Sequence, residues 1–75
     1  MAESRFLTLT DVAEILNISA SQTRALVRTG ELKAIQIGGR NQWRVERTML
    51  EEYIKERYAI AEETIKNERM NADIN

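Results

Sequence analysis

The sequence predicts a mainly α fold that contains one small β-hairpin and ends in a long helix. Three observations support this prediction. Two short amphipathic segments follow one another between Thr8 and Gly30. Two short runs of strand-like composition then flank the turn sequence Gly38-Gly39-Arg40-Asn41. A last segment, from Arg47 to about Glu68, has apolar residues at helical spacing.

The first helix is expected to begin after Thr8, because Asp11 stands three residues later and completes a capping box. Asn17 tolerates the left-handed conformation that the exit from this helix requires, and Ile18 is placed to fill the angle before the next helix. The apolar face of the helix is expected to comprise Val12, Ala13, Ile15 and Leu16.

The second helix is expected to begin after Ser19, which forms a second capping box with Gln22, and to end at Gly30. Its inward face is expected to hold Thr23, Leu26 and Val27. Its outward stripe is expected to hold Ser21, Arg24 and Arg28, with Gln22 and Ala25 beside it. Such a stripe suits the major groove of DNA, where side chains reach base edges and the first amides approach phosphate. The alternative is a solvated face with ordinary surface charge.

The hairpin is expected to pair residues 34–37 with residues 42–45. Alternation places Ile35, Ile37, Trp43 and Val45 in the core and Gln36, Gln42 and Arg44 outside, unless twist exchanges the faces. Trp43 is expected to close the core with its ring. A hairpin beside a recognition helix is a wing, so Arg40 at the tip and Arg44 on the outer face are expected to reach phosphate or the minor groove. The alternative for Arg40 is a charge that serves solubility.

The ordered combination of these segments resembles a known family. The matching stretches are Thr8 to Leu16, Ile18-Ser19, Arg28 to Leu32, Ile35, Ile37-Gly38 and Trp43-Arg44-Val45, and the resemblance covers about residues 6 to 58. The chain is similar to the small winged helix-turn-helix DNA-binding proteins of the MerR and phage-excisionase group. This resemblance implies a winged helix-turn-helix with a long C-terminal helix. The family often has a basic residue where this chain has Ala25, so Arg24 is expected to carry more of the base contact.

Double-stranded DNA is the expected partner. Gln22 and Arg24 are the best candidates for base edges, because glutamine suits adenine and arginine suits guanine. The full set of expected DNA-binding residues is Ser21, Gln22, Arg24, Arg28, Arg40, Asn41, Gln42 and Arg44.

The length of 75 residues allows one domain with a modest core. We expect a disordered segment at residues 1–5, the DNA-binding domain at 6–58, and a helical extension with a disordered tail at 59–75. The absence of cysteine and histidine excludes zinc fingers, cysteine redox chemistry and histidine bases. No apolar run is long enough to span a bilayer and no signal peptide is recognised, so a cytoplasmic location is expected.

The net charge of −1 is low for a DNA-binding protein, but it is unevenly distributed. Residues 1–45 hold six basic and four acidic residues, whereas residues 46–75 hold five basic and eight acidic residues. The positive charge therefore lies in the helix-turn-helix and wing, where it steers DNA locally. Few positive groups still mean few phosphate contacts, so we expect weak monomer binding with a shallow salt dependence.

In the C-terminal helix, Met49, Leu50, Tyr53 and Ile54 are expected to complete the core. An apolar stripe runs along it through Leu50, Ile54, Tyr58, Ala61 and Ile65. It is either a short coiled-coil seam for a dimer or a solvated extension. More than one copy is expected on DNA, either as a dimer through this helix or as head-to-tail copies on repeated half-sites, and the family resemblance favours the second arrangement. Met70 to Asn75 is expected to be disordered.

No enzyme is predicted, because the carboxylate pairs Glu51-Glu52 and Glu62-Glu63 lie on a polar helix surface and Gly38-Gly39 lacks the lysine of a phosphate loop. No cofactor, metal ion or small-molecule effector is expected. Two functions remain. One is sequence-specific DNA binding, as a small transcriptional regulator or an excisionase-like recombination factor. The other is a protein-interaction module whose acidic helix binds an integrase, a regulator or itself.

Overall fold

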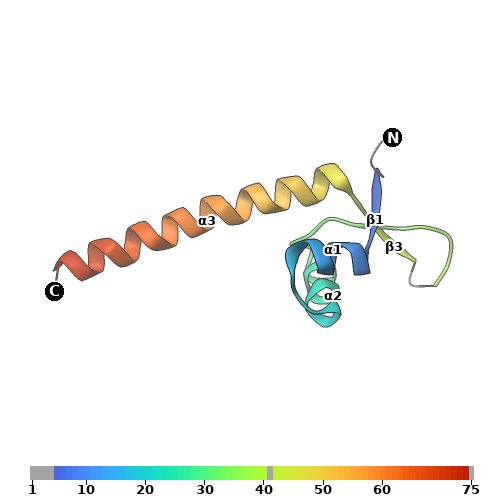
Figure 1. Cartoon of the computed structure of the whole chain (residues 1–75), viewed down its shortest axis with the longest axis horizontal. Coiled ribbons are helices and arrows are strands. Elements are labelled where there is room, and N and C mark those ends of the chain that lie inside the picture. Colours follow the sequence, from blue (N-terminus) through green and yellow to red (C-terminus); the bar gives the residue numbers. More distant parts are fainter. Residues whose placement is uncertain (1–4, 41, 75) are drawn as a thin grey trace.

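Two short helices and a small antiparallel sheet form one end of the molecule, and a long helix projects from it (Figure 1). The computed structural model describes residues 5–40 and 42–74, with side chains described through Arg69. The elements in chain order are β1 (Phe6–Thr8), α1 (Leu9–Leu16), α2 (Ala20–Thr29), β2 (Ile35–Gln36), β3 (Trp43–Glu46) and α3 (Arg47–Ile74). The predicted fold class is confirmed. The sheet has one strand more than the predicted hairpin, because β1 pairs with β3 in the order β1-β3-β2.

Both ends of α1 are fixed by the predicted local contacts. The Thr8 hydroxyl accepts a hydrogen bond from the Asp11 amide at 3.0 Å, and the Asp11 carboxylate accepts one from the Thr8 amide at 3.1 Å. Asn17 has a φ of 57°, in the left-handed region. The amide of Ile18 then donates to the carbonyl of Ala13 at 2.9 Å, as in a Schellman turn. The capping box and the asparagine exit are both confirmed.

The two ends of α2 are fixed by the same kinds of local contact as those of α1. The Ser19 hydroxyl accepts from the Gln22 amide at 3.1 Å, and Gln22 Oε1 accepts from the Ser19 amide at 3.2 Å. Gly30 has a φ of 86° and donates its amide to the carbonyl of Val27 at 3.2 Å. Only glycine reaches this φ without a steric cost, so it allows the chain to leave α2 sharply. The turn between α1 and α2 is therefore held on its α1 side by the exit at Asn17 and on its α2 side by the cap at Ser19.

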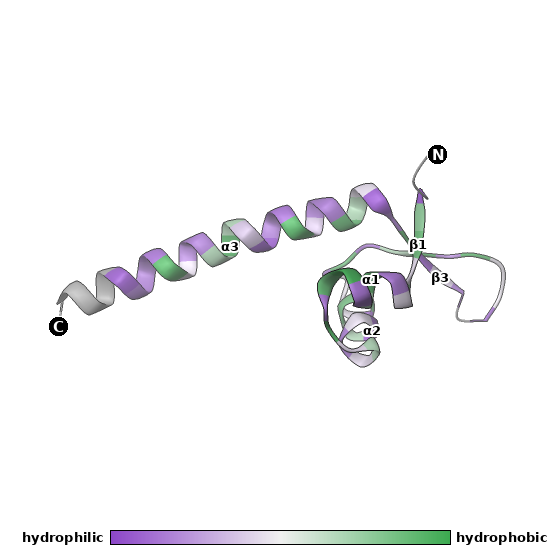
Figure 2. Ribbon diagram, viewed as in Figure 1, coloured by the Kyte–Doolittle hydropathy of each residue, from purple (hydrophilic) through white to green (hydrophobic). Residues whose placement is uncertain are grey.

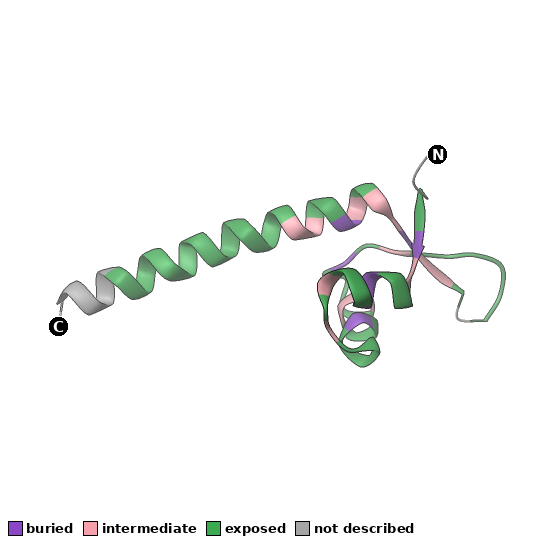
Figure 3. Cartoon of the chain, in the orientation of Figure 1, coloured by how far each residue is buried: buried purple, intermediate pink, exposed green. Residues whose placement is uncertain are grey.

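The hydrophobic core is built from side chains of β1, α1, β3 and α3 and of the segment before β2. Its buried members are Leu7, Val12, Leu32, Val45 and Leu50. Leu7 and Val45 are cross-strand partners, so they lie on the same face of the sheet. Thr23 of α2 is also fully buried, and its hydroxyl donates to the Ser19 carbonyl at 3.1 Å. Each fully buried aliphatic side chain contributes about 1.5–3 kcal/mol, so this small set stabilises the fold only modestly (Figure 3).

The predicted face of α1 is wrong at one position. Leu9, Leu16 and the buried Val12 and Ala13 face the core, whereas Ile15 is 51% exposed. At about 100° per residue, Ile15 lies well over a quarter turn from the middle of that face. A helix of two turns packs on one side only, so a residue at the edge of its face stays in solvent.

The predicted core positions of the hairpin are right for Val45 and wrong for Ile35 and Ile37. Ile35 pairs with Arg44, so the two residues share the face opposite Val45. Ile35 and Ile37 are 50% and 45% exposed. Alternation divides the residues of each strand between two faces. The register between two strands then decides which residues of each strand lie on the same face of the sheet. Here the register exchanges the faces of β2 relative to the prediction.

The helix α3 packs on the core with its first two turns and then leaves it. Leu50 is buried, and Met49, Tyr53 and Ile54 pack against the core, as predicted. From Lys55 to Arg69 every described side chain is exposed (Figure 3). The helix continues to Ile74, beyond the predicted end near Glu68, so the tail predicted to be disordered from Met70 is helical through Ile74. The predictions for residues 1–4 and for Asn75 lie outside the described residues.

Candidate nucleic-acid interface

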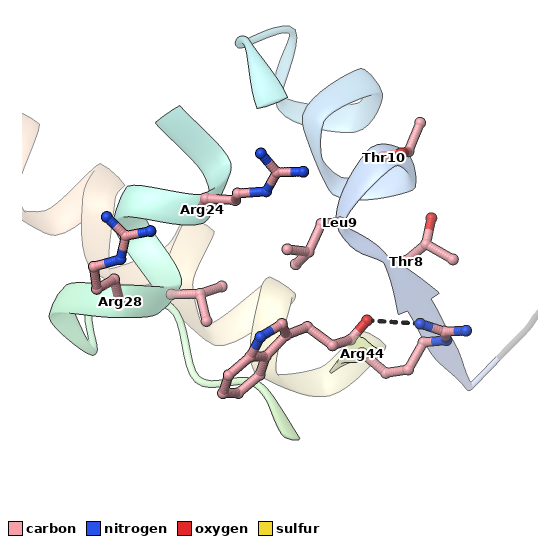
Figure 4. A pocket seen from close by; sticks show the side chains of 8 residues that line it. Thr8, Leu9, Thr10, Arg24, Arg28 and Arg44 are labelled. Atoms are coloured by element: carbon pink, nitrogen blue, oxygen red, sulfur yellow. Dashed lines mark hydrogen bonds between the residues drawn. The ribbon is translucent and has the colours of Figure 1, made fainter. Parts of the chain in front are cut away.

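An open groove of about 820 Å³ lies between α2, the start of α1 and the strand β3 (Figure 4). Its lining comprises Thr8, Leu9, Thr10, Arg24, Val27, Arg28, Trp43 and Arg44. Three of these residues are arginines and none is acidic. The groove is therefore locally positive although the chain carries a net charge of −1, and a local field attracts phosphate regardless of the net charge.

Arg24 and Arg28 come from the exposed face of α2. They are four residues apart, so the helix presents them on the same side, while Thr23 turns into the core. Figure 4 shows Arg24 extending from α2 towards Leu9 at the start of α1. Neither arginine forms an ion pair with a described residue. Both guanidinium groups therefore keep their donors for a ligand.

Arg44 is held more firmly than the arginines of α2. It is half-buried, and its Nη1 donates to the backbone carbonyl of Trp43 at 2.8 Å (Figure 4). Its aliphatic stem lies on the strand next to Thr8, the cross-strand partner of Arg44. The hydrogen bond to the Trp43 carbonyl restricts the Arg44 side chain before any ligand binds, so this side chain loses less rotamer entropy on binding.

Trp43 is half-buried and lines the groove, so the prediction that its ring closes the core is not what the structure shows. The core is closed by Leu32 and Val45, both fully buried. Gln36, the cross-strand partner of Trp43, is itself exposed. The ring therefore forms an apolar wall beside the arginines, with an indole N–H available as a donor.

The other predicted site residues lie outside the groove. Ser21 and Gln22 are exposed at the start of α2, and Arg40 and Gln42 are exposed on the hairpin. Asn41 lies outside the described residues. Gln22 has a second role, since its Oε1 belongs to the capping box. Reading adenine with both amide atoms would require Gln22 to leave that cap, whereas its amide nitrogen remains able to donate.

The start of α1 forms one wall of the groove, which the sequence did not predict. Thr8 and Thr10 line the groove, and Thr10 is exposed in the first turn of the helix. The first amides of a helix have no partner within the helix and favour anions. The capping box at Thr8 already located this helix end in the sequence. Its position opposite Arg24 depends on the packing of α1 against α2.

A comparison with protein families decides the class of this domain. The model of a helix-turn-helix domain family, of the MerR and excisionase-like winged type, matches residues 6–58. The chain belongs to this family. The helix-turn-helix domain is a DNA-binding domain, so DNA is its partner. No curated protein and no solved structure matches the chain significantly. In the described part of the chain, no helix has the length and apolar character needed to cross a membrane.

Proposed function

We propose that this protein binds double-stranded DNA with sequence preference, with α2 in the major groove and the wing on the backbone or in the minor groove. The observation that carries the proposal is the groove that Arg24 and Arg28 of α2 line together with Arg44 of β3, with no acidic residue in its lining. A DNA strand that passes between a recognition helix and a wing presents its phosphates to such a groove.

The residues then take different roles. Arg24 and Ser21 approach base edges from the first turns of α2, and the free amide nitrogen of Gln22 donates beside them. Arg28 and Arg44 hold the backbone of the strand in the groove, and the Trp43 ring packs against its sugars. Arg40 and Gln42, with Asn41, extend the contact along the hairpin. The phosphate contacts fix the register in which the base contacts are read.

Two biological uses fit this binding mode. The chain would act as a small transcriptional regulator or as an excisionase-like recombination factor, and both uses require the same groove. A protein-interaction module is the second candidate, favoured by the exposed, charged helix α3 beyond Ile54. In that case α3, and not the groove, would carry the function.

Selection of duplexes from a random library with the full chain, followed by titration of the selected and a scrambled duplex, tests the proposal. The double charge reversal Arg24→Glu and Arg28→Glu is expected to abolish binding to both duplexes. The matched control Lys66→Glu and Arg69→Glu changes the net charge equally at exposed positions of α3 and is expected to keep the selectivity. Equal loss in both variants would assign binding to net charge. Failure to enrich any duplex would favour the protein-interaction module.

A further inference from the structure

The side chain of Gln22 belongs both to the cap of α2 and to the exposed surface of that helix. It lies in the first turn of α2, where polar and apolar residues alternate along the ribbon (Figure 2). Its Oε1 accepts a hydrogen bond from the Ser19 amide at 3.2 Å, and the Ser19 hydroxyl lies 3.5 Å from the same oxygen. A backbone N–H needs an acceptor opposite it, so the oxygen of the Gln22 amide, and not its nitrogen, must face Ser19.

Ser19 holds this oxygen within a network in which each of its own polar groups is used. The Ser19 hydroxyl accepts from the Gln22 backbone amide at 3.1 Å. The Ser19 carbonyl accepts from the amide and from the hydroxyl of Thr23, each at 3.1 Å, and Thr23 is fully buried. Rotation of the Gln22 amide towards a base would leave the Ser19 amide without its acceptor. The oxygen of Gln22 is therefore committed to the cap.

The amide nitrogen of Gln22 keeps both of its hydrogen atoms for a ligand. Among the described residues, none accepts a hydrogen bond from this nitrogen. Ala25 lies three residues further on, is exposed on the same side of α2, and has no polar side-chain atom that could compete for the amide. Gln22 thus presents two donors and no acceptor to a ligand.

We propose that Gln22 makes this protein select a keto base, guanine or thymine, over an amino base, adenine or cytosine, at one position of its DNA site. The inference rests on the proposed placement of α2 in the major groove. In that groove guanine presents the acceptors O6 and N7, and thymine presents the acceptor O4. All three atoms accept from the amide nitrogen of Gln22.

The amino bases fit the capped side chain less well. Cytosine presents the donor N4, and adenine presents the donor N6 beside its acceptor N7, so an amino group would face the donors of Gln22. A glutamine that is free of such a cap reads adenine with both amide atoms. The cap at Ser19 therefore changes the base that Gln22 prefers, and guanine fits best because two donors meet two acceptors.

Selection from a random duplex library with the full native chain and with Gln22→Ala tests the inference. The position whose base preference changes in Gln22→Ala is the position that Gln22 reads. We expect guanine or thymine there in the native motif, and a loss of roughly tenfold in preference in the variant. Adenine or cytosine at that position, or an unchanged motif, would overturn the inference and leave the proposed function standing. Failure of the native chain to enrich any duplex would overturn both.

Gln22→Glu tests the same contact with the cap retained, because one carboxylate oxygen accepts from the Ser19 amide as in a Ser-x-x-Glu capping box. The other oxygen only accepts, so the preference at this position is expected to move to cytosine or adenine. The matched control Gln36→Glu adds the same charge at an exposed position of β2 outside the groove and is expected to keep the keto base. A keto base retained in Gln22→Glu, or the same shift in the control, would contradict the assignment.

Nuclear magnetic resonance of the native chain on its selected duplex follows the two ends of the Gln22 amide separately. The side-chain NH₂ signals of Gln22 are expected to shift on binding, because the nitrogen donates to a base. The Ser19 amide proton is expected to keep its hydrogen-bonded chemical shift. Its movement to the value found in free Gln22→Ala would show that the oxygen has left the cap to read a base, and the inference would then be wrong.

Discussion

The arginines of the groove differ in how much freedom they lose on binding DNA. The guanidinium of Arg44 is already held by the carbonyl of Trp43 at 2.8 Å, whereas Arg24 and Arg28 have no ion-pair partner among the described residues. A side chain fixed in advance binds a phosphate at a lower entropic cost. Arg44 is thus suited to position the backbone, and Arg24, whose guanidinium has no such contact among the described residues, is suited to adapt to base edges.

Replacement of Arg24 by alanine is expected to weaken binding to the preferred duplex by about 1–3 kcal/mol and to lower the preference over a scrambled duplex. The reason is the loss of a guanidinium that reads a guanine edge. Titration of both duplexes with the variant measures this ratio, and Arg69→Ala on the distal part of α3 is the control. If the ratio stays at the native value, Arg24 does not read bases.

Arg40 is fully available at the hairpin tip but lies outside the groove. Its replacement by alanine is expected to weaken binding to all sequences alike and to reduce the slope of log affinity against log salt by about 1. Titrations at several salt concentrations measure the slope. Unchanged affinity and slope on every duplex would mean that the tip of the wing does not touch DNA.

At the scale of elements, the boundaries of α1 and α2 depend on local contacts, and the sequence predicted them correctly. Thr8 with Asp11 and Ser19 with Gln22 form reciprocal caps between residues three apart. Such contacts need only the chain within one turn, so the pattern of residue types is sufficient to predict them. The strands differ, because β2 has two residues and takes its position from β3.

Loss of the second cap is expected to destabilise the domain. Ser19→Ala removes the hydroxyl that accepts from the Gln22 amide and should lower the free energy of unfolding by about 1 kcal/mol. Ser21→Ala removes the same hydroxyl group from the exposed face of the first turn of α2, so it serves as the control. It is expected to change the free energy of unfolding little. Urea unfolding followed by circular dichroism compares the two. A similar stability of both variants would show that the cap does not limit the stability of the domain.

At the scale of the whole molecule, an elongated shape of 54 × 29 × 17 Å results from the projection of α3 beyond a small core. The core contacts of α3 end at Ile54, so the two parts of this helix have different roles. The part up to Ile54 stabilises the domain. The longer part beyond it extends into solvent, where an isolated helix is only marginally stable without a partner.

A chain cut after Tyr58 is expected to remain folded and to bind a single DNA site with nearly the native affinity, because no described side chain beyond Ile54 packs on the core. Its cooperativity on a duplex with two sites is expected to fall, because Ala61 and Ile65 of the apolar stripe on α3 are gone. Thermal unfolding and DNA titration of both chains measure these effects. Cooperativity that survives the cut would place assembly in contacts along the DNA.

The sequence by itself determined the features that depend on neighbours along the chain: two capped helices, the left-handed exits at Asn17 and Gly30, the hairpin, the long helix and the arginine stripe of α2. The tertiary structure decided what depends on the register and packing of distant segments. It added β1, turned Ile35 and Ile37 to solvent, moved Trp43 to the groove wall and brought Arg44 into the same groove as Arg24. Local spacing gives the two faces of each element, but only contacts between elements decide which face is buried.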